Sequence, residues 1–259
     1  MSRLDTDNEI ATSRRVAFCS TCSTTWCSKL AELDGHARGR LAAVVFDMDG
    51  LLLDSERLAR ELFFATCVEI GMQVDPAVYD RCVGTTHEGT AQILSAILGA
   101  AGYEELEARW SARYEARIRA HPVPVKAGAL ALLEYLQSTS VPLALATSTR
   151  RPVAERKLQL AGLAAFFPVM VCGGETPRGK PHPDPYLAAL EHLGQPPARC
   201  LALEDSDNGV RAAHAAGLKV IQVPDLLEPA PAVRALGHQV VSDLHAVLAD
   251  LRSGPTLAG

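Results

Sequence analysis

Residues 41–50 read LAAVVFDMDG, and this stretch gives the most direct indication of the fold class. Leu41–Phe46 is a short apolar run containing two valines, which is typical of a parallel strand buried on both faces. Two acidic residues, Asp47 and Asp49, follow at the point where this strand is expected to end, and Gly50 favours a sharp turn there. In open α/β sheets the carboxyl ends of the strands form the ligand crevice. We therefore expect both carboxylates to lie in such a crevice.

Apolar runs of the same kind recur downstream and alternate with helical patterns. The further runs are Val141–Ala146, Phe167–Cys172, Cys200–Leu203, Leu218–Val223 and Gln239–Val241. The helical patterns between or beside them are Ala129–Gln137, Val153–Leu160, Pro185–Leu193 and Asn208–Ala216. Strands that alternate with helices predict an α/β fold with a Rossmann-like parallel sheet.

One segment departs from this alternation. Between Arg57 and His121 the sequence carries helical patterns and no convincing strand. The patterns are Glu56–Ile70, Glu88–Leu98 and Glu104–Ala120. We predict a small all-helical cap domain over residues 58–121, inserted after the first strand, and a core domain made of residues 41–57 and 122–252. Residues 1–40 show no sustained period, so we expect a flexible N-terminal extension.

Composition limits the class of partner. The 259-residue chain carries a formal net charge of -5 with a pI near 5.9, which disfavours nucleic acid as the main partner. No apolar run approaches the roughly 18 residues that a membrane helix needs. The N-terminus also lacks the apolar segment of a secretory signal. The sequence therefore predicts a cytoplasmic protein, a monomer or weak oligomer, with no membrane or nucleic-acid partner.

Polar residues follow three more of the expected strands. Thr147 and Ser148 bring hydroxyl groups to the end of one, Lys180 lies in a loop after another, and Glu204 and Asp205 form an acidic pair at the end of a third. Because the ends of neighbouring parallel strands meet at one edge of a sheet, these groups are expected to converge with the first acidic pair.

The combined set has a coherent chemistry. Several carboxylates without a cation would repel and would not all stay ionised, and a hard divalent ion such as Mg²⁺ resolves this. Lys180 offers a point positive charge for a transferring phosphoryl group, and Thr147 offers a hydroxyl. Backbone N–H groups near Gly50 and Ser148 are candidates for further contacts to a phosphorylated substrate.

These motifs, taken in order, resemble the four signature motifs of the haloacid dehalogenase superfamily. The stretches FDMDGLLLDSERL, LATSTR, GKPHPDPY and LEDSDNGVRAAHAAG look like the β-phosphoglucomutase-like and pseudouridine-5′-phosphatase-like subgroup of its hydrolases. The resemblance covers about residues 41–245. It implies the fold described above and a phosphatase that acts on a small phosphorylated metabolite, such as a sugar phosphate or a nucleoside monophosphate.

The resemblance also implies roles for individual residues. Asp47 would be the nucleophile that forms an aspartyl-phosphate, and Asp49 the acid/base. Thr147 would bind the transferred phosphoryl oxygens, and Lys180 would neutralise charge around Asp47 and the phosphate. The implied Mg²⁺ ligands are Asp47, Asp49 through its carbonyl, Asp205 and, as a second acidic ligand, Glu204.

The expected cap contributes a further candidate contact. Gly84-Thr85-Thr86-His87 fits a loop that faces the active site, in which Thr85 and His87 touch substrate. An ordinary turn before a helix explains the same residues equally well, so both interpretations stay open.

Other functions remain as alternatives. Phosphomutase relatives place a histidine where this chain has Ala59, which favours hydrolysis over isomerisation. A dehalogenase has no need of Asp49, because a halide leaves without a proton. A phosphonatase would need a cap amine for a Schiff base, and residues 58–121 contain no lysine. A binding protein on this fold would tolerate the loss of a motif residue, whereas every motif position is filled here.

Overall fold

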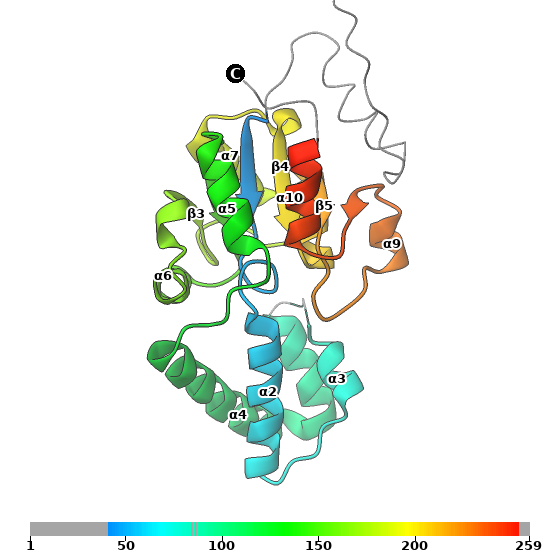
Figure 1. Ribbon diagram of the computed structural model, residues 1–259. Helices are drawn as coiled ribbons and strands as arrows, with labels where there is room; N and C mark the ends of the chain where they lie inside the picture. The colour runs from blue at the N-terminus through cyan, green and yellow to red at the C-terminus, as the bar shows by residue number, and fades with distance from the viewer. Residues whose placement is uncertain (1–40, 84, 86, 254–259) are drawn as a thin grey trace, which may run out of the picture. The chain divides into compact units, whose positions relative to one another are not determined.

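The core of the protein is a parallel sheet that matches the fold class predicted from the sequence (Figure 1). The computed structural model describes residues 41–83, 85 and 87–253. Within them the strands follow the order β3-β2-β1-β4-β5-β6, and every neighbouring pair is parallel. The strands are β1 (Ala43–Phe46), β2 (Leu143–Ala146), β3 (Val169–Val171), β4 (Cys200–Glu204), β5 (Lys219–Gln222) and β6 (Gln239–Val240). The predicted extension over residues 1–40 lies outside the described residues.

Strand β1 is fully buried because helices cover both faces of the sheet. Ala43 and Val45 point into an apolar cluster that also contains residues of α7 (Asp184–Leu193) and α8 (Asp207–Ala215). Helices α5 (Ala129–Ser138) and α10 (Leu244–Ser253) pack together on the opposite face (Figure 1). This burial on both faces explains why the strand reads as an uninterrupted apolar run rather than an alternating one.

The remaining core elements include some that the sequence patterns did not predict. Helix α6 (Arg151–Leu160) follows β2, and the short helix α9 (Pro231–Arg234) precedes β6. Neither α9 nor α10 was predicted. Strand β3 is shorter than the apolar run expected at Phe167–Cys172, because Phe167 precedes the strand and packs its ring edge-on against Phe46, with centroids 5.7 Å apart.

The segment between β1 and α5 contains helices and no strand within its described residues, as expected for the cap. It contains α2 (Ser55–Glu69), α3 (Pro76–Asp80) and α4 (His87–Ala120). Its own apolar cluster comprises Phe63, Cys67, Tyr79, Cys82, Leu94, Tyr103 and Leu106. Helix α4 is interrupted at Gly99, whose φ of 74° and ψ of 166° are non-helical, so the two long helices expected in this region meet there. The domain boundaries at residues 58 and 121 stay predictions.

The two connections between the cap and the core run beside each other. Leu53 and Val125 form an antiparallel bridge, and the Asp54 amide donates to the Pro124 carbonyl at 2.8 Å. The Lys126 amide then donates to the Leu52 carbonyl at 2.9 Å. The entry to and the exit from the helical segment are therefore tied together next to the end of β1. None of the helices within the described residues is long and apolar enough to span a membrane.

Candidate active site

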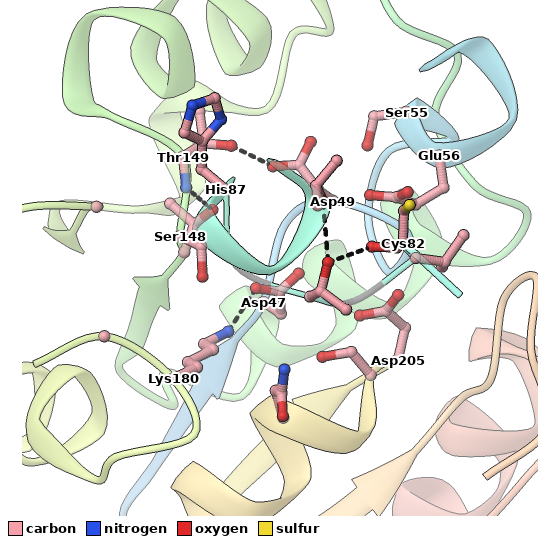
Figure 2. A pocket seen from close by; sticks show the side chains of 18 of the residues that line it. Asp47, Asp49, Ser55, Glu56, Cys82, His87, Ser148, Thr149, Lys180 and Asp205 are labelled. Atoms are coloured by element: carbon pink, nitrogen blue, oxygen red, sulfur yellow. Dashed lines mark hydrogen bonds and ion pairs between the residues drawn. The ribbon is translucent and has the colours of Figure 1, made fainter. Parts of the chain in front are cut away.

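A cavity of about 1110 Å³ lies at the carboxyl ends of the strands, and most of the predicted site residues line it. From the core these are Asp47, Asp49, Thr147, Ser148, Lys180 and Asp205, and from the cap Thr85 and His87. Figure 2 shows the first two aspartates, the lysine and Asp205 gathered around one space. The fold therefore brings together groups that are far apart in the sequence. Gly50 and Glu204 do not line the cavity but lie directly behind residues that do.

Asp47, Lys180 and Glu204 form a buried chain of charges. The ammonium Nζ of Lys180 lies 2.6 Å from Asp47 Oδ1 and 2.5 Å from Glu204 Oε1. The Tyr186 hydroxyl donates a further hydrogen bond of 2.6 Å to the same Glu204 oxygen. Because Lys180 is buried, it needs these two carboxylates to remain charged. The lysine is consequently fixed beside Asp47.

Glu204 has protein partners on both carboxylate oxygens. Its Oε2 accepts hydrogen bonds from the Asp205 amide at 3.1 Å and from the Ser206 amide and hydroxyl at 3.3 and 3.2 Å. The α8 helix reaches this carboxylate closely, since a Cβ added to Gly209 would lie 1.9 Å from the Glu204 carboxyl carbon. Glu204 thus anchors Lys180 and the start of α8, a role that the sequence motif alone did not predict.

The acidic residues of the site carry more negative charge than the protein itself neutralises. Asp47, Glu204 and Asp205 each offer a carboxylate oxygen, and these atoms lie within 4.8 Å of one another. Burial raises the pKa of Asp47 to about 7, even though Lys180 acts in the opposite direction. Burial, reinforced by the carboxylates of Asp47 and Glu204, also raises the pKa of Asp205 well above its usual value. A bound cation would relieve this repulsion, so the donor set fits a metal ion with oxygen ligands.

The backbone at Gly50 lets Asp205 approach the loop that follows β1. Gly50 has a φ of +85°, and a Cβ at this position would lie 2.1 Å from Asp205 Oδ2. A side chain would therefore both strain the turn and displace a carboxylate of the acidic cluster.

Asp49 has a different environment from Asp47. The Thr149 hydroxyl donates to its Oδ2 at 2.6 Å (Figure 2), and Lys157 Nζ lies 2.7 Å from its Oδ1. Burial acts to raise the pKa of Asp49, but the Lys157 ammonium and these hydrogen bonds outweigh it, so the pKa lies below its ordinary value. The two aspartates of the first motif are thus held by separate partners, as two separate roles require.

The hydroxyl residues after β2 provide further polar groups. Thr147 is buried, and its Oγ1 accepts a hydrogen bond of 3.1 Å from the Thr149 amide. Ser148 is exposed to the cavity. Both follow a strand that neighbours β1, so their placement agrees with the expected convergence of strand ends.

The cap side of the cavity carries Thr85, His87 and Ala59. The Thr85 hydroxyl donates to the Cys82 carbonyl at 2.7 Å and lies 2.9 Å from the Thr90 hydroxyl. His87 is the first residue of α4. Both residues are thus available to face a substrate, and their contact with it stays a prediction.

Among the site residues that were not predicted, three left a signal in the sequence. Lys157 shares the buried face of α6 with Ala154 and Leu158, at helical spacing, where an apolar residue is usual. Tyr186 belongs to the GKPHPDPY stretch but has no charge to draw attention. Glu56 lines the cavity, and burial raises its pKa to about 7. For Lys157, the signal that could have predicted a buried functional role is an ionisable residue at a position of the helix where apolar residues are expected.

Comparison with known proteins identifies the family. Residues 44–223 match the family model described as haloacid dehalogenase-like hydrolase, which is more than half of the chain. The chain belongs to this family. The predicted membership of the haloacid dehalogenase superfamily and the predicted fold class are thereby confirmed.

Relatives of this haloacid dehalogenase-like hydrolase include named phosphatases. The chain is 33% identical over 182 residues to a phosphorylated carbohydrates phosphatase of Thermotoga maritima, covering 70% of this chain and 84% of that one. It is 35% identical over 192 residues to a protein of Drosophila melanogaster named as a probable pseudouridine-5′-phosphatase, covering 70% and 80%. A solved haloacid dehalogenase family hydrolase from Deinococcus radiodurans, with bound phosphate and sodium, has a TM-score of 0.70 and 27% identity, and the match covers 83% of this chain and 97% of that one.

Proposed function

We propose that this chain is a Mg²⁺-dependent phosphatase that hydrolyses the monoester of a small phosphorylated metabolite through an aspartyl-phosphate on Asp47. The observation that carries this proposal is the position of Asp47 at the end of β1, with Lys180 Nζ 2.6 Å from its Oδ1 and Asp205 beside it. A carboxylate held beside a lysine ammonium and a candidate cation site is suited to attack phosphorus.

The reaction class follows from the family. The chain is a phosphoric monoester hydrolase of the haloacid dehalogenase type, in common with its named phosphatase relatives. The finer points that remain proposals are the metal, the covalent intermediate, the residue roles and the substrate.

The proposed chemistry has two steps with Asp47 as the nucleophile. In the first, an Asp47 oxygen forms a bond to phosphorus, the bond from phosphorus to the alcohol oxygen breaks, and Asp49 gives that oxygen the proton that it gained in the second step of the preceding turnover. In the second, Asp49 accepts a proton from water, the water oxygen bonds to phosphorus, and the Asp47–phosphorus bond breaks. Lys180 and Thr147 hold the phosphoryl oxygens throughout.

The metal proposal rests on the excess of buried negative charge at the acidic cluster. Asp47 and Asp205 are the carboxylates that would hold Mg²⁺, and the Asp49 carbonyl is a further candidate, since the carboxylate of Asp49 has Lys157 and Thr149 as partners. Both oxygens of Glu204 are used by protein donors, so we assign it to anchoring Lys180 rather than to direct metal binding. When bound, Mg²⁺ would neutralise developing charge on the phosphoryl group.

The substrate class is inferred from the cavity and from the relatives. A cavity of about 1110 Å³ lined by carboxylates, hydroxyls and cap residues suits a polar molecule of metabolite size. Two relatives are named as phosphatases of phosphorylated carbohydrates and of pseudouridine 5′-phosphate. We therefore propose a sugar phosphate or a nucleoside monophosphate as substrate, with Thr85 and His87 facing its non-phosphate part.

The proposal is tested by phosphate release from a panel of sugar phosphates and nucleoside monophosphates, with and without Mg²⁺. We expect turnover that a chelator abolishes and Mg²⁺ restores. Asp47→Asn should reduce kcat by at least about 10³-fold while the variant remains folded, because the amide is nearly isosteric but a poor nucleophile. Full activity in excess chelator would refute the metal assignment, and an active Asp47→Asn variant would refute the nucleophile.

A further inference from the structure

Lys157 is a buried lysine that lies apart from the acidic cluster of Asp47, Glu204 and Asp205, so neutralising that cluster does not explain its burial. Its side chain is 4% exposed, and it lies on α6, outside the ordered motifs. The neighbouring basic residue of the same helix, Arg156, is exposed, as a helical arginine usually is. Burying an ammonium group costs free energy unless a specific partner compensates it. The partner of Lys157 therefore indicates what the residue does.

That partner is the carboxylate of Asp49, and the contact leaves Asp49 little freedom to rotate. Lys157 Nζ lies 2.7 Å from Oδ1, while the Thr149 hydroxyl donates to Oδ2 at 2.6 Å. One donor on each oxygen fixes both torsions of a short side chain.

The other side of the ammonium faces the cap. Nζ of Lys157 lies 5.1 Å from the ring centroid of Tyr114 on α4, within the distance of a cation–π contact. Lys157 is thus in contact with the acid/base candidate and with the long cap helix at once. Arg156 also reaches α4, donating to the Arg119 carbonyl at 3.1 Å, but it does not line the cavity or contact Asp49.

From these contacts we propose that Lys157 is a positioning residue that fixes the orientation of the Asp49 carboxylate. We also propose that Tyr114 links this orientation to the position of helix α4. The inference rests on the proposed function, because it assumes that Asp49 protonates the leaving group. A purely structural ion pair would stabilise the fold without affecting one kind of leaving group more than another.

Two aryl phosphates of nearly the same shape separate these possibilities. Phenolate is a poor leaving group that benefits from a proton, whereas 4-nitrophenolate leaves readily without one. The parameter kcat/KM reports only the steps up to loss of the phenol, so the later attack of water on the aspartyl-phosphate does not enter. In Lys157→Met we expect kcat/KM for phenyl phosphate to fall by about 10- to 100-fold. For 4-nitrophenyl phosphate, kcat/KM should fall by less than about fivefold.

Control variants make the result specific. Arg156→Met removes a basic side chain that also contacts α4, and it should leave both rates unchanged. Tyr114→Leu should reproduce the selective loss on phenyl phosphate in weaker form. If Lys157→Met does not fold, Lys157→Arg serves instead, because a guanidinium keeps the charge but places its donors differently. We expect a selective loss on phenyl phosphate of at least about threefold for that variant.

The outcomes distinguish this inference from the proposed function. If wild type hydrolyses both aryl phosphates with Mg²⁺ but Lys157→Met loses both equally, or neither, the positioning role is wrong while the phosphatase assignment stands. An Lys157→Arg variant that matches wild type on both substrates also overturns it. If wild type releases no phosphate from any tested substrate, the proposed function itself fails.

Discussion

Gly209 gives the Glu204 carboxylate the space in which it anchors Lys180. A Cβ at this position would lie 1.9 Å from the carboxyl carbon, although alanine is favoured over glycine inside a helix by about 1 kcal/mol. We expect Gly209→Ala to displace Glu204 and with it Lys180, lowering kcat on the order of 10²-fold. Steady-state kinetics with the best phosphate substrate would measure this.

A control for this substitution is available on the same helix. Ala215 is exposed on α8, so Ala215→Ser makes a comparably small change away from the site. It should leave kcat unchanged. If Gly209→Ala proved as active as Ala215→Ser, the anchoring role of Glu204 would have to be abandoned.

Single residues also mark the limit of sequence-based prediction for this site. Asp47, Asp49 and Lys180 were predicted because each carries a charge just after a recognisable strand or in the loop that follows one. Lys157, the partner of Asp49, was not predicted. It lies 108 residues further along the chain, and a lysine on a helix is usually solvated. Glu204 was predicted as a metal ligand, and the hydrogen bonds that support its proposed anchoring role are visible only in the folded chain.

The paired connections between cap and core depend on one buried carboxylate. Asp225, in the loop after β5, is 2% exposed and accepts from Lys126 on the return connection and from Arg57 on α2, the latter at 3.4 Å. Asp225→Ala should lower the free energy of unfolding by about 1–3 kcal/mol, the usual contribution of a hydrogen bond to a charged group. Urea denaturation would measure the change.

An exposed ion pair provides the matched comparison. Asp80 pairs with Arg60 at 3.7 Å, and both side chains are about 40% exposed, at 43% and 40%. Asp80→Ala should therefore lower the free energy of unfolding by less than about 1 kcal/mol. Equal losses in the two variants would contradict the view that Asp225 holds the connections together.

Helices and strands were predictable where burial produced a clear pattern. All six described strands coincide with the predicted runs. The pattern is clearest for β1, β2 and β4, which are buried throughout, because a parallel strand covered on both faces tolerates few polar residues. The short helices were missed: α3 spans only Pro76–Asp80, although Asp75 caps it by accepting from the Ala77 amide at 2.8 Å. Helix α10 was also missed, although its buried residues Leu244, Val247 and Leu248 follow helical spacing. The ends of elements depend on tertiary contacts such as that of Phe167 with Phe46.

The whole molecule combines a core that holds the reacting groups with a cap that has its own apolar cluster. The choice between hydrolysis and phosphoryl transfer to a second substrate depends on how the cap controls access of water. Ala59, on the cap side of the cavity, offers no proton-carrying group, and its carbonyl accepts from Trp110 Nε1 at 3.1 Å. A mutase must exclude water while a bisphosphate intermediate reorients, and this position gives it no side chain to link cap closure with proton transfer.

We therefore expect the enzyme to release its covalent intermediate to water. With glucose 1-phosphate and a trace of glucose 1,6-bisphosphate, free phosphate should appear in a one-to-one ratio with glucose, and glucose 6-phosphate should be negligible. Coupled assays for phosphate, glucose and glucose 6-phosphate measure all three products in one sample. In the proposed mechanism Asp49 activates water after the first product leaves, so a substrate that binds poorly lowers the rate of both products together and does not change their ratio. Formation of glucose 6-phosphate faster than phosphate would instead place the enzyme among the phosphomutases, and the interpretation of Ala59 would be wrong.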